Sequence, residues 1–205
     1  VDSNYNQYAQ NIKALRQKRS LEYLAKIPFT DFKVFEKVIP ALPKNSQLQI
    51  SNSSPIRYAQ LFDIEKSIEV FSNRGTSGID GSTSTAIGAA VASKKPNVFI
   101  AGDIGFLYDS NALWNNYIPK NFKIILINNG GGGIFRILPG HDETPVFNTF
   151  FETSHCLTAE NLAKMYGLNY LTASNETTLD ESLKTLFSYT YHQSNCSESA
   201  LFGNF

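Results

Sequence analysis

The sequence predicts an α/β domain built on an open parallel sheet of about five or six strands, with helices on both faces. Two observations lead to this class. Apolar segments of five or six residues alternate with longer helix-like segments, which is the pattern of chains that form parallel sheets. Ten of the 13 glycines fall between residues 75 and 133, just after strand-like segments. Ligands of open parallel sheets bind at these strand ends.

The first half of the chain is expected to supply an arm, two helices and two strands. Residues 5–25 are polar and indicate a helix or a connecting arm, so we separate an arm over 1–28 from a domain over 29–205. After Pro28, Thr30 can cap a short amphipathic helix. Its apolar residues are Phe32, Val34, Phe35, Val38 and Ile39. The segment "QLQIS", in the region of 48–52, and the segment "IEVFS" (68–72) indicate strands, and the small residues of 82–95 indicate a helix.

The second half begins with a short buried strand at 97–101 and has its most apolar strand, "KIILIN", at 123–128. Between them, 109–118 is helix-like. Thr158 can cap a helix that ends near Gly167, and "LNYLT" (168–172) follows as a strand. Thr178 with Glu181 three residues later indicates a capping box for a last helix. The tail "HQSNCSESALFGNF" offers no convincing final strand.

Charge and composition exclude several classes of function. Lysine plus arginine equals aspartate plus glutamate, at 18 each, so bulk charge favours neither nucleic acid nor an anionic membrane surface. No apolar run approaches the roughly 20 residues that span a bilayer. Cys156 and Cys196 are too few for a disulfide framework, which indicates a reducing cytoplasm. His141, His155 and His192 have no metal-ligand spacing and are expected in loops or on the surface.

Two polar residues follow neighbouring strands of the expected sheet. Asp103 lies two residues past the strand 97–101, and Asn129 directly follows 123–128. Their separation of 26 positions fits one strand–helix–strand step, which places a carboxylate and an amide oxygen side by side. Such hard oxygen ligands suit Mg²⁺, with a backbone carbonyl of the glycine turn as a further ligand. The four glycines after Asn129 would let the backbone turn closely under a metal-bound diphosphate.

The spacing from Gly102-Asp103 to Asn128-Asn129, with 24 residues between the two pairs, resembles the diphosphate-binding motif of thiamin diphosphate enzymes. Ile104 stands where a glycine is usual. The blocks "SNSSPIRYAQLF", "SNRGTSGIDGSTSTAIGAA", "AGDIGFLYDSNAL" and "INNGGGGIFRILP" narrow the resemblance to the synthases of the menaquinone pathway. The resemblance covers about 30–190 and is distinctive over 51–138. It implies that 29–205 is a thiamin diphosphate- and Mg²⁺-binding domain.

The resemblance assigns a role to each matched position. Mg²⁺, or Mn²⁺ in its place, would be held by the side chains of Asp103 and Asn129 and the carbonyl of Gly131. The cofactor would contact Ser77, Gly78, Gly102, Ile104, Gly105, Gly132 and Ile134, and Ile79 would be the apolar wedge that bends it. Substrate carboxylates would meet Ser53, Arg57 and Arg74, because the planar guanidinium of arginine suits a carboxylate. Ile134, Phe135 and Leu138 would form an apolar wall beside the reacting carbon.

The family's reaction joins 2-oxoglutarate to isochorismate with loss of carbon dioxide. In this family a glutamate on a separate, preceding domain activates the cofactor, usually across a dimer interface. We therefore expect this chain to be the C-terminal third of a longer cytoplasmic enzyme that works as a homodimer or tetramer. The missing N-terminal domains and a second subunit would be its partners, and the chain alone would have no synthase activity.

Two alternatives remain open from the sequence. The chain could belong to another thiamin diphosphate-dependent decarboxylase or carboligase, although Ser53, Arg57 and Arg74 argue for dicarboxylate substrates. It could also be a module that binds Mg²⁺ and a nucleotide diphosphate without chemistry. A dinucleotide-binding fold should show G-x-G-x-x-G after its first strand, and "GDIGFL" lacks the third glycine.

Overall fold

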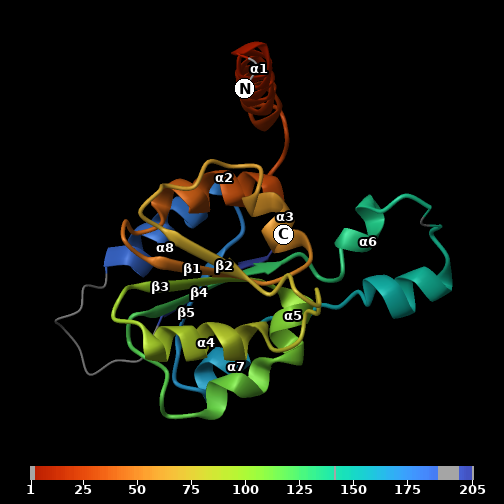
Figure 1. The fold of residues 1–205 in the computed structure, drawn as a ribbon. Coiled ribbons are helices and arrows are strands. Elements are labelled where there is room, and N and C mark those ends of the chain that lie inside the picture. The colour runs from red at the N-terminus through yellow and green to blue at the C-terminus, as the bar shows by residue number, and fades with distance from the viewer. Residues whose placement is uncertain (1–2, 141, 189–198, 205) are drawn as a thin grey trace.

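A computed structural model describes residues 3–140, 142–188 and 199–204 (Figure 1). Its centre is a six-stranded sheet in the order β2-β1-β3-β4-β6-β5, and every neighbouring pair is parallel. The strands are β1 (Gln47–Ile50), β2 (Glu69–Ser72), β3 (Asn97–Gly102), β4 (Phe122–Asn128), β5 (Asn169–Ala173) and β6 (Ser199–Asn204). The α/β class and the strand number predicted from the sequence are confirmed.

Two layers of helices cover the sheet (Figure 1). On one face lie α2 (Asp31–Ala41), α3 (Ser54–Ala59) and α8 (Glu176–Ser188). On the other lie α4 (Ser82–Ala92), α5 (Asp103–Tyr108) and α7 (Glu160–Met165). The strands serve both layers because successive side chains point to opposite faces. In β3, Val98 and Ile100 join the first core, whereas Phe99 and Ala101 join the second.

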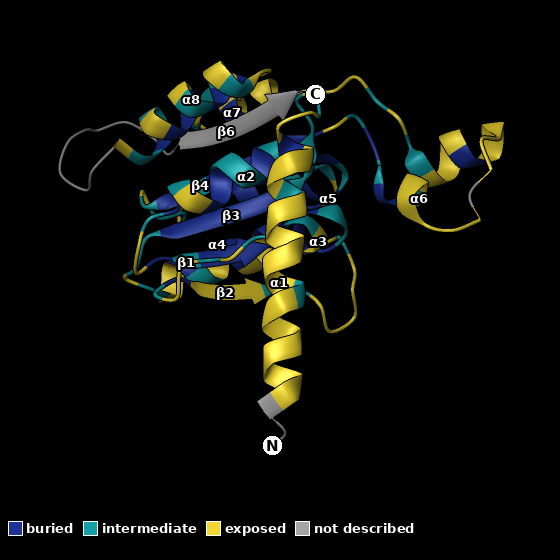
Figure 2. Cartoon of the chain, turned by 90° about the horizontal axis from the view of Figure 1, so that it is seen from above, coloured by how far each residue is buried: buried dark blue, intermediate teal, exposed yellow. Residues whose placement is uncertain are grey.

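The helix α1 (Ser3–Leu24) confirms the predicted polar helix and projects away from the sheet, with almost all of its surface exposed (Figure 2). Lys13 and Gln17 bond the carboxylate of Asp63, and Leu24 is buried at the base. No helix among the described residues is both long and apolar enough to cross a membrane. The boundary placed at residue 28 stays a prediction.

The strand β6 corrects an expectation from the sequence, since the tail did supply a last strand. β6 lies between β4 and β5 and is parallel to both. Its sequence, "SALFGN", has only three apolar residues in a row, so local pattern gave little signal. Its partner strands on both sides provide the hydrogen bonds that complete the sheet.

Helix positions also differ from the expectations around 103–118. The α-helix α5 starts at Asp103, directly after β3, and only a short 3₁₀ helix, η1 (Ser110–Trp114), lies in the predicted segment 109–118. The buried side chain of Asp109 explains the break. It accepts hydrogen bonds from the backbone N–H of Ser84 at 2.7 Å and from its hydroxyl at 2.6 Å, which ties this point of the chain to α4.

Two predicted caps are wrong in their details. The helix α7 follows Ala159 and not Thr158. In α8 the capping side chain is Asn175, whose Oδ1 accepts from the N–H of Thr178 at 2.9 Å. Thr178 Oγ1 accepts from the N–H of Asn175 in return, at 3.2 Å. The reciprocal pair thus starts at Asn175, three residues earlier than the sequence indicated. Thr30 does precede α2, but its side chain makes no capping bond.

Candidate functional site

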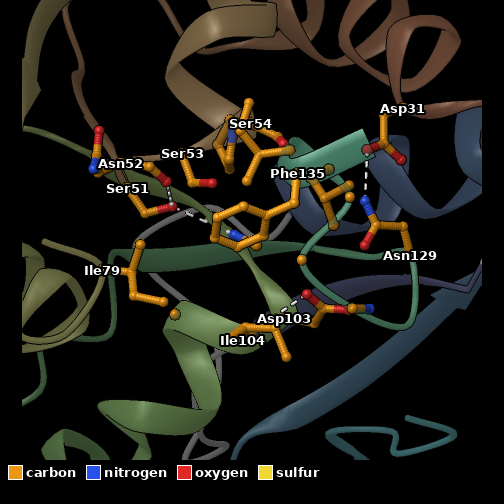
Figure 3. Close-up of a pocket in the computed structure, with 18 of the residues that line it drawn as sticks. Asp31, Ser51, Asn52, Ser53, Ser54, Ile79, Asp103, Ile104, Asn129 and Phe135 are labelled. Carbon is orange, nitrogen blue, oxygen red and sulfur yellow. Dashed lines mark hydrogen bonds between the residues drawn. The ribbon is translucent and has the colours of Figure 1, made fainter. Parts of the chain in front are cut away.

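A cavity of about 230 Å³ opens at the carboxyl ends of the central strands (Figure 3). Its wall includes most of the residues that the sequence singled out: Ser53, Ile79, Gly102, Asp103, Ile104, Gly105, Asn129, Gly131, Gly132, Ile134 and Phe135. It also includes residues that sequence reasoning missed, among them Asp31, Phe35, Ser51, Asn52, Tyr58 and Tyr108. Asp31 and Asn129, which are 98 positions apart in the sequence, thus meet in one site.

The carboxylate of Asp103 is the most buried charge in this wall, with the residue 4% exposed. One oxygen accepts from the N–H of Ile104 at 2.7 Å, and the other accepts from the N–H groups of Gly130 at 2.8 Å and Gly131 at 2.9 Å. Burial raises the pKa of Asp103 above its ordinary value, and these backbone bonds and nearby His155 only partly oppose the shift. A bound cation would favour the ionised form.

Asn129 sits across from Asp103, as the spacing predicted, because β3 and β4 pair in register up to Gly102 and Ile127. Its Nδ2 donates to Oδ2 of Asp31 at 2.9 Å (Figure 3). The Asn129 Oδ1 accepts no hydrogen bond from the described part of the chain. Burial raises the pKa of Asp31, and the negative charge of Asp103 adds to that shift.

The glycine turn after β4 is closely packed against the end of η2 (Phe147–Glu152), a π-helical turn, and against the residues that follow it. A Cβ on Gly131 would lie 2.8 Å from the carbonyl oxygen of Glu152. The N–H of Gly132 donates to the same carbonyl at 2.6 Å. Glycine is therefore needed at 131 because two backbone segments approach within contact distance there. On the other side of the cavity, a Cβ on Gly105 would lie 3.1 Å from the carbonyl oxygen of Ile79.

His155 lies in a loop, as expected, and its side chain lies beside Asp103 and is only 12% exposed. Its Nε2 is 3.2 Å from Oδ2 of Asp103, although it has no hydrogen-bond partner of good geometry. Among the described residues no group of three His, Cys, Asp or Glu side chains could hold a metal. A cation here would depend on amide and carbonyl oxygens beside a single carboxylate.

Of the residues expected to meet substrate carboxylates, Ser53 lines the cavity, and the two arginines bond residues of its wall. Ser53 lines the cavity and has a φ of +79°, and its carbonyl accepts from Nη1 of Arg57 at 2.8 Å. Arg74 donates to Oδ1 of Asn52 at 2.6 Å, and Nδ2 of Asn52 donates to the carbonyl of Ser77. Ser77 has a φ of +60°. Positive φ outside glycine is uncommon and is often found at functional sites.

Five of the predicted site residues are outside the cavity wall: Arg57, Arg74, Ser77, Gly78 and Leu138. Their proposed contacts remain predictions. Ile134 begins the short helix α6 (Ile134–Ile137), is buried, and lines the cavity with Phe135. Leu138 is 45% exposed and follows the same helix, on a segment that projects from the body (Figure 1).

The donor set fits a divalent cation with an attached anionic group. Asp103 and Asn129 offer a carboxylate and a free amide oxygen, which are ligands of the type that Mg²⁺ prefers. Two carboxyl groups, the buried one of Asp103 and the partly buried one of Asp31, face one cavity. Among the described residues no lysine or arginine pairs with either. The surplus of negative charge and the close-packed glycines therefore favour a cation-dependent ligand.

Comparison with known proteins points the same way. Residues 53–194 match the family described as thiamine pyrophosphate enzyme, C-terminal TPP binding domain; thiamine pyrophosphate is another name for thiamin diphosphate. Proteins named 2-succinyl-5-enolpyruvyl-6-hydroxy-3-cyclohexene-1-carboxylate synthase are similar over most of this chain. The one from Flavobacterium johnsoniae is 72% identical over 91% of the chain. Those from Christiangramia forsetii and Bacteroides fragilis are 51% and 45% identical over 87% and 78%. The chain spans about a third of the length of these relatives, 34% for the first.

Proposed function

We propose a function from the premise that this chain belongs to the thiamine pyrophosphate enzymes and contains their C-terminal TPP binding domain. The chain holds the diphosphate of thiamin diphosphate through Mg²⁺, for which Mn²⁺ can substitute. The observation that carries this proposal is the position of Asp103 and Asn129 at the ends of β3 and β4, facing one cavity beside the glycine turn. Their side-chain oxygens and the Gly131 carbonyl are the proposed metal ligands.

The residues around these proposed metal ligands would contact the rest of the cofactor. Gly102, Ile104, Gly105 and Gly132 border the diphosphate position, and Ser77 and Gly78 approach the cofactor from the turn after β2. Ile79 lies in the cavity wall and packs close to Gly105, so it can support the bent shape of the cofactor. The bound cofactor supplies a carbanion and an electron sink.

We propose further that the complete protein is a 2-succinyl-5-enolpyruvyl-6-hydroxy-3-cyclohexene-1-carboxylate synthase, the name that its relatives carry. Its substrates would be 2-oxoglutarate and isochorismate. Arg57, Arg74 and Ser53 would orient their carboxylates, since both substrates are dicarboxylic acids. Ile134, Phe135 and Leu138 would shield the reacting carbon from water. These roles are supported by the position of Ser53 in the cavity wall and by the apolar side chains of Ile134 and Phe135 in the same wall.

Activation of the cofactor belongs to another part of the protein in this proposal. A glutamate on a preceding domain, contributed across a dimer or tetramer interface, would act on the cofactor, so residues 1–205 alone would be inactive. We place the protein in the cytoplasm, because the sequence has two cysteines and the described one, Cys156, is a free exposed thiol.

The experiment uses the complete protein that contains this chain, with thiamin diphosphate and Mg²⁺. Carbon dioxide release is measured with 2-oxoglutarate or with pyruvate, each in the presence of isochorismate. We expect release from 2-oxoglutarate that depends on both cofactor and metal, and little from pyruvate. Faster release from pyruvate would indicate a different carboligase. Binding of Mg²⁺ and the cofactor without any turnover would indicate a module that binds without chemistry.

A further inference from the structure

The contact between Asp31 and Asn129 has a direction that chemistry fixes. An ionised carboxylate can only accept hydrogen bonds, whereas an amide side chain has one accepting and one donating end. Asp31 Oδ2 therefore selects Nδ2 of Asn129, at 2.9 Å. The opposite end, Oδ1, is turned away from Asp31, and Figure 3 shows this arrangement at the cavity.

We propose that Asp31 is a positioning residue that presents the oxygen of Asn129, and not its nitrogen, to the metal. This inference rests on the proposed function, because it needs a cation between Asp103 and Asn129. Without a fixed acceptor at Asp31 the amide could rotate and offer a donor, which cannot bind a cation. Groups that orient metal ligands in this way often matter nearly as much as the ligands.

The position of Asp31 is well defined by the core. It is the first residue of α2, which buries Val34, Phe35, Val38 and Ile39 against the sheet. Among the described residues, Asp31 has no ion-pair partner that would explain its partly buried carboxylate. The nearby lysines on α2 pair elsewhere, Lys33 with Glu176 and Lys37 with Asp180. Its hydrogen-bond partner is the amide that it orients.

Charge is the competing explanation, since Asp31 also adds a negative charge near the metal. Three variants of the complete protein separate charge from orientation: Asp31→Asn, Asn129→Asp and the double variant Asp31→Asn with Asn129→Asp. The double variant keeps the total charge and restores a donor–acceptor pair, now with the donor at 31. Asn129→Asp adds charge but sets two carboxylates against each other, so the two explanations predict opposite effects on metal affinity.

The measurement is the Mg²⁺ concentration that half-saturates thiamin diphosphate binding, followed by calorimetry. Free Mn²⁺, followed by its electron paramagnetic resonance signal, provides a second readout without turnover. We expect this concentration to rise by about tenfold or more in each single variant. In the double variant we expect it to return to within about threefold of the wild-type value. Thermal unfolding without metal checks that each variant folds. If Asp31→Asn does not fold, Asp31→Ser takes its place, and the same loss of metal affinity is expected.

Two results would overturn the inference. One is Asp31→Asn with a metal requirement within about twofold of wild type. The other is Asn129→Asp with tighter metal binding than wild type, which would show that charge alone decides. The wild-type protein tests the proposed function separately. If its cofactor binding were absent or independent of Mg²⁺, the proposed function would fail, and this inference with it.

Discussion

The carboxylate of Asp103 accepts a hydrogen bond from the backbone N–H of Gly131, at 2.9 Å. Asp103 follows β3 and Gly131 belongs to the turn after β4, so this bond ties together the ends of two adjacent strands. The turn is held from its other side by the backbone of Glu152. Hydrogen bonds therefore link the proposed metal ligand Asp103 directly to the glycine turn.

The buried carboxyl group makes stability depend on pH. Burial raises the pKa of Asp103 in the folded protein above its ordinary value of 3.8. The favourable contribution of the Asp103 carboxyl group to stability is thus fully present below its unfolded-state pKa. It is lost as pH rises through its folded-state pKa. Asp103→Asn is neutral at every pH and keeps an acceptor for the glycine N–H groups. Without divalent cations, we expect the free energy of unfolding of this variant, relative to that of wild type, to increase as pH rises from about 4 to about 7.

Urea unfolding at a series of pH values measures this difference. Asp31, whose pKa is also raised by burial, is present in both proteins and largely cancels. A difference in free energy that stays constant over the pH range would contradict the account. Addition of Mg²⁺ and cofactor should raise the free energy of unfolding of wild type relative to the variant, because ligand bound to the native state stabilises wild type.

Gly131→Ala tests the close approach of the two backbone segments. The new methyl group would lie 2.8 Å from the carbonyl oxygen of Glu152, and neither backbone can move away without shifting the turn. We expect a loss of about 1–3 kcal/mol in stability and weaker cofactor binding. Gly88→Ala is the control, because nothing lies within 4 Å of its added Cβ in α4. It should be neutral or stabilising by up to about 1 kcal/mol. Equal effects in thermal unfolding would contradict the prediction.

Asn52→Ala tests the link between Arg74 and the turn before α4. Asn52 accepts from Arg74 and donates to the carbonyl of Ser77, so its loss frees both. In the complete protein we expect the KM for 2-oxoglutarate to rise roughly tenfold. The matched control is Asn73→Ala, whose side chain bonds Thr85 away from the cavity. Steady-state kinetics that show the same change for both variants would rule out this role.

The sequence predicted the sheet well because its strands carry their own signal. β3 and β4 contain continuous buried apolar runs, over 98–101 and 124–127, as expected for central strands of a parallel sheet. β6 has little such signal and depends on pairing with β4 and β5. The start of α5 was missed because Asp103 begins a helix while its side chain bonds a distant turn. Tertiary contacts decided both cases.

The candidate site shows the same division. Spacing along neighbouring strands was enough to bring Asp103 and Asn129 to one cavity. Asp31 and His155 could not be found in that way. An aspartate in the first turn of a helix is ordinary in sequence, and a lone histidine in a loop has no metal-ligand spacing. Both become recognisable only when the fold places them beside Asn129 and Asp103.

The most direct test of the central claim is a calorimetric titration of thiamin diphosphate into the complete protein, with and without Mg²⁺, beside the Asp103→Ala variant. The account predicts binding to wild type that requires Mg²⁺. It predicts a loss in the variant at least as large as the roughly 10- to 100-fold effect of residues that only support a metal ligand. Binding that is independent of Mg²⁺ and unchanged in Asp103→Ala would contradict it.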